Sequence, residues 1–89
     1  MATVHFTRWL EGIAPGKALE IEGDTVGDVL HRLFADNAQA RNYVLDEQGR
    51  LRRHVCVFLD GTRLPHDNAL AATTQPCSEI YVMQALSGG

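Results

Sequence analysis

The sequence predicts an α+β domain in which one main helix packs across a mixed β-sheet. Two strand-like segments open the chain, one helical segment follows them, and two further strand-like segments lie in the second half. The apolar stripe of a single helix must be covered, and the apolar face of a sheet can cover it. With 89 residues, the chain is long enough for one such domain with one modest core.

The first two strands are expected at residues 2–10 and 17–22. The first segment is rich in β-branched and aromatic residues. Gly12 and Pro15-Gly16 supply turn chemistry between the two segments. In the second segment apolar and acidic residues alternate, as they do on a half-buried strand. We therefore predict that these strands form a hairpin.

The main helix is expected to begin after Thr25, where the spacing of apolar residues changes to that of a helix. Thr25 and Asp28 approximate a capping box, in which the hydroxyl accepts a hydrogen bond from an otherwise unpaired backbone N–H group. The apolar residues that share one helical face are Val26, Val29, Leu30, Leu33 and Phe34.

The middle of the chain carries a weaker pattern. We interpret residues 37–53 as an extended connection that contains a turn at residues 46–49. Residues 54–59 are a short apolar run that suits a strand buried on both faces. Asp60-Gly61 then supplies a turn.

The last part of the domain is expected to end in a strand. Residues 68–72 fit one turn of helix, and Pro76 prevents its continuation. Residues 79–84 alternate as a strand with Ile80 and Val82 on one face. The domain is therefore predicted to span residues 1–84, and residues 85–89 are predicted to form a flexible tail.

The composition favours a cytoplasmic protein that binds neither nucleic acid nor membranes. The formal net charge is −3, whereas broad nucleic-acid binding requires a concentrated positive field. No segment is long and apolar enough to span a bilayer, and residues 1–10 lack the pattern of a signal peptide. In a reducing cytosol, Cys56 and Cys77 are expected to remain thiols.

One basic run, Arg50-Leu51-Arg52-Arg53, departs from this acidic balance. Such runs commonly form a solvated loop surface. The alternative interpretation is that Arg52 and Arg53 help to dock a partner protein.

No metal site, bound cofactor or catalytic centre is expected within the domain. The four histidines and two cysteines lack the close pairs that are typical of structural zinc ligands. Cys56 lies in an apolar strand, where burial disfavours the reactive thiolate, and Cys77 has no evident activating partner. The glycines near the helix lack the spacing of a phosphate-binding loop.

The end of the sequence is its most unusual feature. Ala85, Leu86 and Ser87 follow the last strand, and Gly88 and Gly89 come after them. Five extended residues reach roughly 17 Å, far enough to enter the active site of a partner. Glycine has no Cβ, so such a tail can pass through a narrow channel and expose its carboxylate. Terminal glycines are also common in disordered chain ends, so this ending alone is weak evidence.

Taken with the order of the elements, the ending resembles the MoaD/ThiS family of ubiquitin-like sulfur carriers. The resemblance covers the whole chain and is carried by residues 23–30, 55–61, 79–82 and 86–89. It implies the β-grasp, or ubiquitin-like, fold. Among members of the family, residues 45–54 look most like carriers of cysteine biosynthesis or related thiolation pathways.

The resemblance also implies a chemistry. An activating enzyme would use ATP to adenylate the carboxylate of Gly89, and a sulfur donor would then displace AMP and leave a thiocarboxylate. Gly88 would give steric access, and residues 85–87 would be gripped by the partner. The thiocarboxylate would pass its sulfur to a biosynthetic enzyme. The carrier itself would be a monomer without enzymatic activity.

Several alternatives remain open at this stage. Cys77-Ser78 stands where the family often has Gly-Asp, and Ser87 stands where molybdopterin-type tails often have alanine, so the sulfur acceptor is open. Phe58 and Tyr81 are candidates for an exposed docking surface, although ordinary core packing is the favoured interpretation for both. The chain could also be a modifier that is linked to lysines through Gly89, or a non-covalent interaction module.

Overall fold

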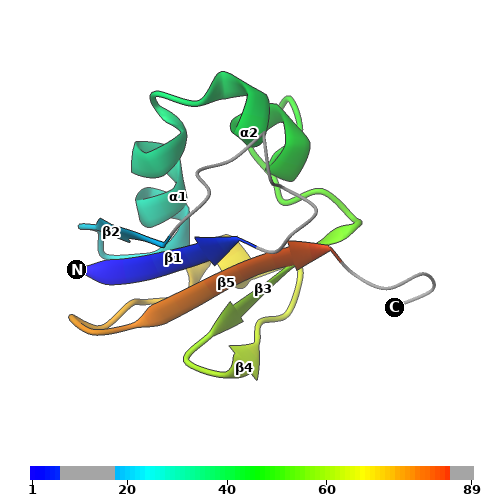
Figure 1. Cartoon of the computed structure of the whole chain (residues 1–89). Coiled ribbons are helices and arrows are strands. Elements are labelled where there is room, and N and C mark those ends of the chain that lie inside the picture. Colours follow the sequence, from blue (N-terminus) through cyan, green and yellow to red (C-terminus); the bar gives the residue numbers. More distant parts are fainter. Residues whose placement is uncertain (7–17, 85–89) are drawn as a thin grey trace.

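The computed structural model describes residues 1–6 and 18–84. The predicted end of the first strand, the turn that follows it, and the tail at residues 85–89 lie outside the described residues. The described elements follow the predicted order, with additional elements at residues 38–44 and 62–63 (Figure 1).

A five-stranded mixed sheet forms the body of the protein. Its strands lie in the order β2-β1-β5-β3-β4, and their bounds are Ala2–Phe6 for β1, Leu19–Ile21 for β2, Val55–Leu59 for β3, Thr62–Arg63 for β4 and Glu79–Gln84 for β5. Strand β5 runs parallel to β1 and antiparallel to β3. The predicted hairpin of β1 and β2 is confirmed by their antiparallel pairing.

The last strand lies at the centre of this sheet. Ile80 and Val82 of β5 are fully buried, as are Val55 and Val57 of β3 and Val4 of β1. These residues alternate with others along each strand, so their side chains point to the same face. The predicted bounds of β5 agree with the structure, and the predicted start of β3 differs by one residue.

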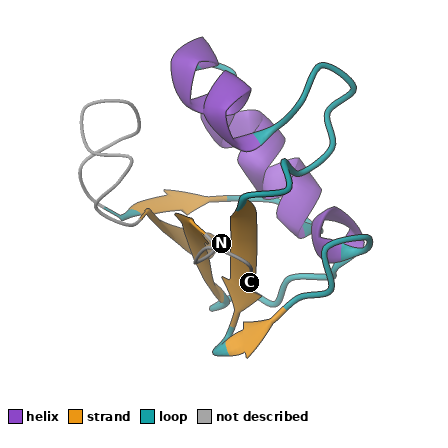
Figure 2. Ribbon diagram, turned by 90° about the vertical axis from the view of Figure 1, so that its right-hand side faces the viewer, coloured by secondary structure: helices purple, strands orange, loops and turns teal. Residues whose placement is uncertain are grey.

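Helix α1 (Val26–Phe34) covers the apolar face of the sheet (Figure 2). The predicted cap is confirmed, because the Asp28 backbone N–H donates to Thr25 Oγ1 at 3.0 Å. In a capping box the Asp28 carboxylate would accept from the N–H of the cap residue, Thr25. Here it accepts instead from the N–H of the preceding residue, Asp24, at 3.2 Å. All five apolar residues of the predicted stripe are buried.

The prediction of an extended connection over residues 37–53 was wrong in its first half, where the chain forms helix α2 (Ala38–Val44). Asn37 caps this helix, and its Oδ1 accepts from the Ala40 N–H at 3.1 Å. Ala40 and Val44 are fully buried against the core. Two buried positions are too few to give a recognisable period, so packing against the rest of the fold stabilises α2.

The remaining elements close the fold around the start of α1. The predicted single turn of helix is present as the 3₁₀ turn η2 (Ala69–Ala71). Directly after it, the Ala72 carbonyl accepts from the Val26 N–H at 2.9 Å, and the Asp24 carbonyl accepts from the Thr74 N–H at 3.0 Å. The predicted turn at Asp60-Gly61 joins β3 to the short strand β4.

Candidate functional site

The tail residues that the sequence singled out, Gly89, Gly88, Ser87, Leu86 and Ala85, all lie outside the described residues. Their point of origin is described. Strand β5 ends at Gln84, which pairs with Val55 of β3. The tail therefore starts at the middle of the sheet, from a strand with hydrogen-bonded neighbours on both sides.

Phe58 and Tyr81 lie on the face of the sheet opposite the helices. Their strand neighbours Val57 and Val82 are fully buried under the helices, and alternate residues of a strand point to opposite faces. Phe58 and Tyr81 are direct partners in the register of β3 and β5. Phe58 is half-buried and Tyr81 is 39% exposed. Neither side chain belongs to the core cluster beneath the helices, where core packing would have placed it. Whether Phe58 and Tyr81 dock a partner stays a prediction.

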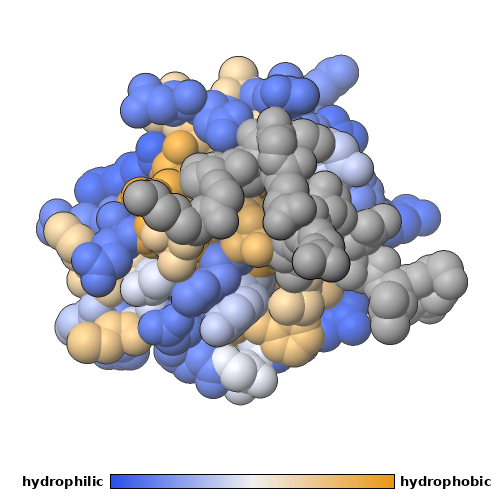
Figure 3. Space-filling view, in the orientation of Figure 1, coloured by the Kyte–Doolittle hydropathy of each residue, from blue (hydrophilic) through white to orange (hydrophobic). Residues whose placement is uncertain are grey.

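A stacked pair extends this face onto β1. The rings of His5 and Tyr81 lie nearly parallel, with centroids 4.3 Å apart. His5 Nε2–H donates to the carboxylate of Glu79 on the neighbouring strand. Figure 3 shows one side of the molecule, and hydrophobic and hydrophilic residues are interspersed on the part of it that is not grey. The open face thus combines aromatic surface with hydrogen-bonding groups, as protein-binding surfaces do.

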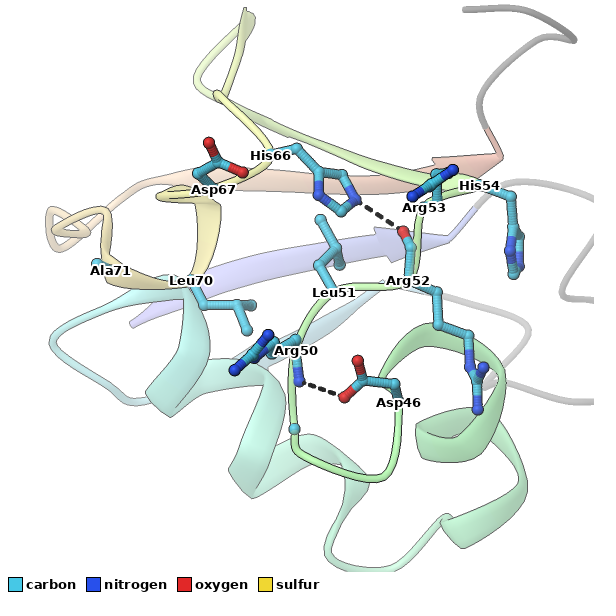
Figure 4. A pocket seen from close by; sticks show the side chains of 11 residues that line it. Asp46, Arg50, Leu51, Arg52, Arg53, His54, His66, Asp67, Leu70 and Ala71 are labelled. Atoms are coloured by element: carbon cyan, nitrogen blue, oxygen red, sulfur yellow. Dashed lines mark hydrogen bonds between the residues drawn. The ribbon is translucent and has the colours of Figure 1, made fainter.

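A second surface lies in the loop between α2 and β3. A groove of about 920 Å³ is lined by Asp46, Gly49, Arg50, Leu51, Arg52, Arg53, His54, His66, Asp67, Leu70 and Ala71 (Figure 4). The basic run of the sequence forms one wall. His66 comes from the segment before η2 and donates through Nε2–H to the Arg52 carbonyl at 2.8 Å. Sequence reasoning identified Arg52 and Arg53 but missed His66.

The loop that carries the arginines is held by its own hydrogen bonds. Leu45 and Leu51 form an antiparallel bridge, and the Asp46 N–H donates to the Arg50 carbonyl at 2.8 Å. Gly49, with φ of 81°, makes the tight turn between them. Arg52 is held from both its backbone and its side chain, because its N–H donates to the Val44 carbonyl and its Nε–H to the Asn42 carbonyl.

Asp46 is the anion at the base of this loop. Its Oδ1 accepts from the backbone N–H groups of Arg50 and Gln48, both at 2.9 Å. The bond from Arg50 is the main cause that lowers the pKa of Asp46 below its ordinary value of 3.8, and the charges of Arg50 and Arg52 lower it further. The lowered pKa favours the ionised carboxylate of Asp46, which stabilises the turn through its two hydrogen bonds.

The described residues hold no group of three or more side chains that could ligate a metal ion. Cys56 is buried and Cys77 is exposed, and both are free thiols. None of the helices in the described part of the chain has the length and apolar character needed to cross a membrane.

These features define a β-grasp domain, in which a mixed sheet wraps around one main helix and presents its other face to solvent. The chain matches no protein-family model and no curated protein sequence. Comparison with solved structures confirms the β-grasp, ubiquitin-like fold.

Three solved structures show this likeness over nearly the whole chain. A chain of the BexX/CysO complex of Amycolatopsis orientalis has a TM-score of 0.84 at 20% identity, with 100% of both chains covered. CysO of Mycobacterium tuberculosis, described as an antigen, has a TM-score of 0.83 at 21% identity, with 97% of this chain and 100% of that chain covered. SAMP1, the small archaeal modifier protein 1, of Methanosarcina acetivorans has a TM-score of 0.82 at 22% identity, with 99% of this chain and 95% of that chain covered.

Proposed function

We propose that this protein is a ubiquitin-like sulfur carrier that carries its sulfur on the carboxylate of Gly89. The observation that supports the proposal most is the position of β5. This strand is held between β1 and β3 and leads directly into the sequence that ends in Gly88-Gly89. The fold shared with CysO and SAMP1 proteins agrees with a small protein that works through partners.

The proposed chemistry proceeds in two steps. The Gly89 carboxylate attacks the α-phosphorus of ATP in an activating enzyme, and pyrophosphate leaves. A sulfur donor at the level of hydrosulfide then attacks the acyl carbon, AMP leaves, and a thiocarboxylate remains. A carboxylate is a poor electrophile, so adenylation supplies the leaving group that the second step needs. The sulfur atom of the thiocarboxylate later attacks an acceptor that is bound to a biosynthetic enzyme.

In this scheme the partner enzymes would supply the catalytic groups and bind the ATP. The carrier would place the Gly89 carboxylate in their active sites. Gly88 gives the tail access to a narrow channel, and Ala85, Leu86 and Ser87 form the segment that the enzyme grips. Phe58 and Tyr81 give the activating enzyme an aromatic surface on the open face, and the neighbouring strand β5 leads to the tail. A solved complex of CysO with BexX gives a precedent for a protein of this fold bound to a second protein.

Intact-mass spectrometry tests the proposal. The chain is incubated with the activating enzyme of its host, ATP and a sulfur source, and its mass is compared with that of a sample without ATP. We expect one oxygen to be replaced by one sulfur, and fragmentation should place the change at Gly89. If no candidate activating enzyme from the host produces the exchange, the proposal is wrong.

A second candidate function is conjugation to other proteins, which the fold match to a small archaeal modifier protein favours. In that case the Gly89 carboxylate would form an amide with a lysine side chain. Digestion of host proteins would then yield lysine-containing peptides that carry a branch from the tail of this chain. A non-covalent interaction module would give neither branched peptides nor a thiocarboxylate.

A further inference from the structure

The basic groove beside β3 is a surface that the proposed chemistry does not use. Three of the eight lysines and arginines of the chain, Arg50, Arg52 and Arg53, line it, although the chain as a whole is acidic. The exposed Arg50 and Arg53 side chains make no hydrogen bond or ion pair with any described residue, in contrast to Arg32, which is paired with Asp28. The groove therefore offers two cations that have no ion pair among the described residues, although the charge of Arg50 also acts on Asp46.

The arrangement of the charges suits an extended ligand. In Figure 4 the guanidinium groups of Arg50, Arg52 and Arg53 point in different directions and do not converge on one point. A single phosphate is normally held by donors that converge on it. Charges spread along a groove instead match several carboxylates on one chain segment.

The floor of the groove supports the same choice of ligand. Leu51 is buried and Leu70, in η2, is half-buried. Both side chains line the groove. A peptide can place apolar side chains on such a floor and acidic side chains against the wall. Asp67 is exposed at the rim and disfavours a polyanion of high charge density.

The groove also lies close to the end of β5, from which the tail starts. Arg53 and His54 directly precede Val55, the residue that pairs with Gln84 at the end of β5. A protein that receives the tail is therefore brought next to the arginines. Arg52 is fixed by its bonds to Asn42 and Val44, so the wall is already formed before a partner arrives.

We propose that this groove binds an acidic segment of a partner protein, with carboxylates of that segment paired to Arg50 and Arg53. That this partner is an enzyme that receives the tail rests on the proposed function above. The pairing itself does not depend on that function. Exposed ion pairs are individually weak and salt-dependent, so the groove would guide and orient the partner more than it would hold it.

A titration of the full chain tests the proposal. The probe is a fluorescent peptide of alternating glutamate and leucine residues, and its glutamine counterpart is the neutral control. We expect the acidic peptide to bind and to change NMR signals of residues 50–54 and 66–71. The double change Arg50→Glu, Arg53→Glu should weaken binding roughly tenfold, and added salt should weaken it as well.

The control is Arg63→Glu, at an arginine that is also exposed but lies on β4, and it should change binding by less than about twofold. The proposal is overturned if the neutral peptide binds equally well or if Arg63→Glu weakens binding as much as the double variant. It is also overturned if inorganic phosphate or a short RNA gives the same NMR changes and displaces the peptide, because the groove would then take a phosphate-bearing ligand.

Mass spectrometry of the wild-type chain and the peptide titration together separate the two proposals. If the activating enzyme makes a thiocarboxylate on the wild-type chain but no acidic peptide binds the groove, the groove proposal fails and the sulfur carrier stands. If the peptide binds the groove but no thiocarboxylate forms with any host enzyme, the sulfur-carrier proposal fails and the groove proposal stands. With both confirmed, the double variant should form its thiocarboxylate more slowly at low enzyme concentration and normally at saturation.

Discussion

Asp60 connects the β3–β4 turn to the beginning of the central strand. Its Oδ1 accepts from the Glu79 N–H at 2.8 Å, and its Oδ2 accepts from the Ser78 hydroxyl at 3.1 Å. Ser78 is 1% exposed, so its hydroxyl needs this partner. Asp60 also has a φ of 50°, a conformation that aspartate and asparagine tolerate better than most residues. One side chain thus serves the turn and the anchor of β5 together.

Replacement of Asp60 should therefore destabilise the fold. Asp60→Ala removes both acceptors and leaves alanine at positive φ, and we expect it to lower the free energy of unfolding by about 1 to 3 kcal/mol. Asp60→Asn keeps one acceptor and the tolerance for positive φ, so its loss should be smaller. Urea denaturation measures both changes. The exposed Asp67→Ala is the control, and an equal loss in Asp67→Ala and Asp60→Ala would contradict this role.

Asp46 gives the arginine loop a defined dependence on pH. Its folded-state pKa is lowered, first by the hydrogen bond from the Arg50 N–H. The carboxylate therefore contributes stability that is fully present above its unfolded-state pKa and is lost as the pH falls through the lower folded-state value. We expect an NMR titration of the Asp46 carboxyl to give a midpoint below 3.8. A midpoint at or above 3.8 would show that the two backbone bonds do not hold the carboxylate.

At the scale of elements, the sequence predicted those that have a strong apolar period. Helix α1 has a complete apolar stripe and a cap, and β5 alternates, so both agree with the structure. Helix α2 was missed because only Ala40 and Val44 face the core. The groove was missed in part for a related reason: His66 and Arg52 are 14 residues apart and meet only through the tertiary fold.

The contact between α1 and η2 leads to a prediction that opposes helix propensity. Gly27 lies in the first turn of α1, where alanine would ordinarily be favoured by up to about 1 kcal/mol. A Cβ at Gly27 would lie 2.9 Å from the Leu70 carbonyl oxygen and 3.2 Å from the Leu70 Cβ. The first is a backbone atom, so relief requires η2 to move.

We therefore expect Gly27→Ala to destabilise the protein, by about 1 to 2 kcal/mol, because overpacking outweighs the gain in propensity. Thermal denaturation followed by circular dichroism measures the change. His31→Ala, at an exposed position of the same helix, should be close to neutral. A stabilised Gly27→Ala protein would mean that α1 and η2 are not closely packed in solution.

For the molecule as a whole, the proposed function assigns different tasks to the described body and to the tail that is proposed to react. All of the described strand pairings and the buried core lie within residues 1–84. The proposed function therefore makes opposite demands on the two parts: the body must persist, and the tail must reach into a partner.

Deletion of Gly88 and Gly89 should consequently separate stability from activity. We expect the truncated chain to unfold at the same urea concentration as the full chain, because no described hydrogen bond or core contact is lost. It should form no thiocarboxylate with the activating enzyme and ATP. A permanent extension beyond Gly89 should have the same effect, because the carboxylate of Gly89 is then part of a peptide bond. If either variant sustained the host pathway at the wild-type level, the role of the tail in covalent chemistry would be refuted, and the body alone would have to account for function.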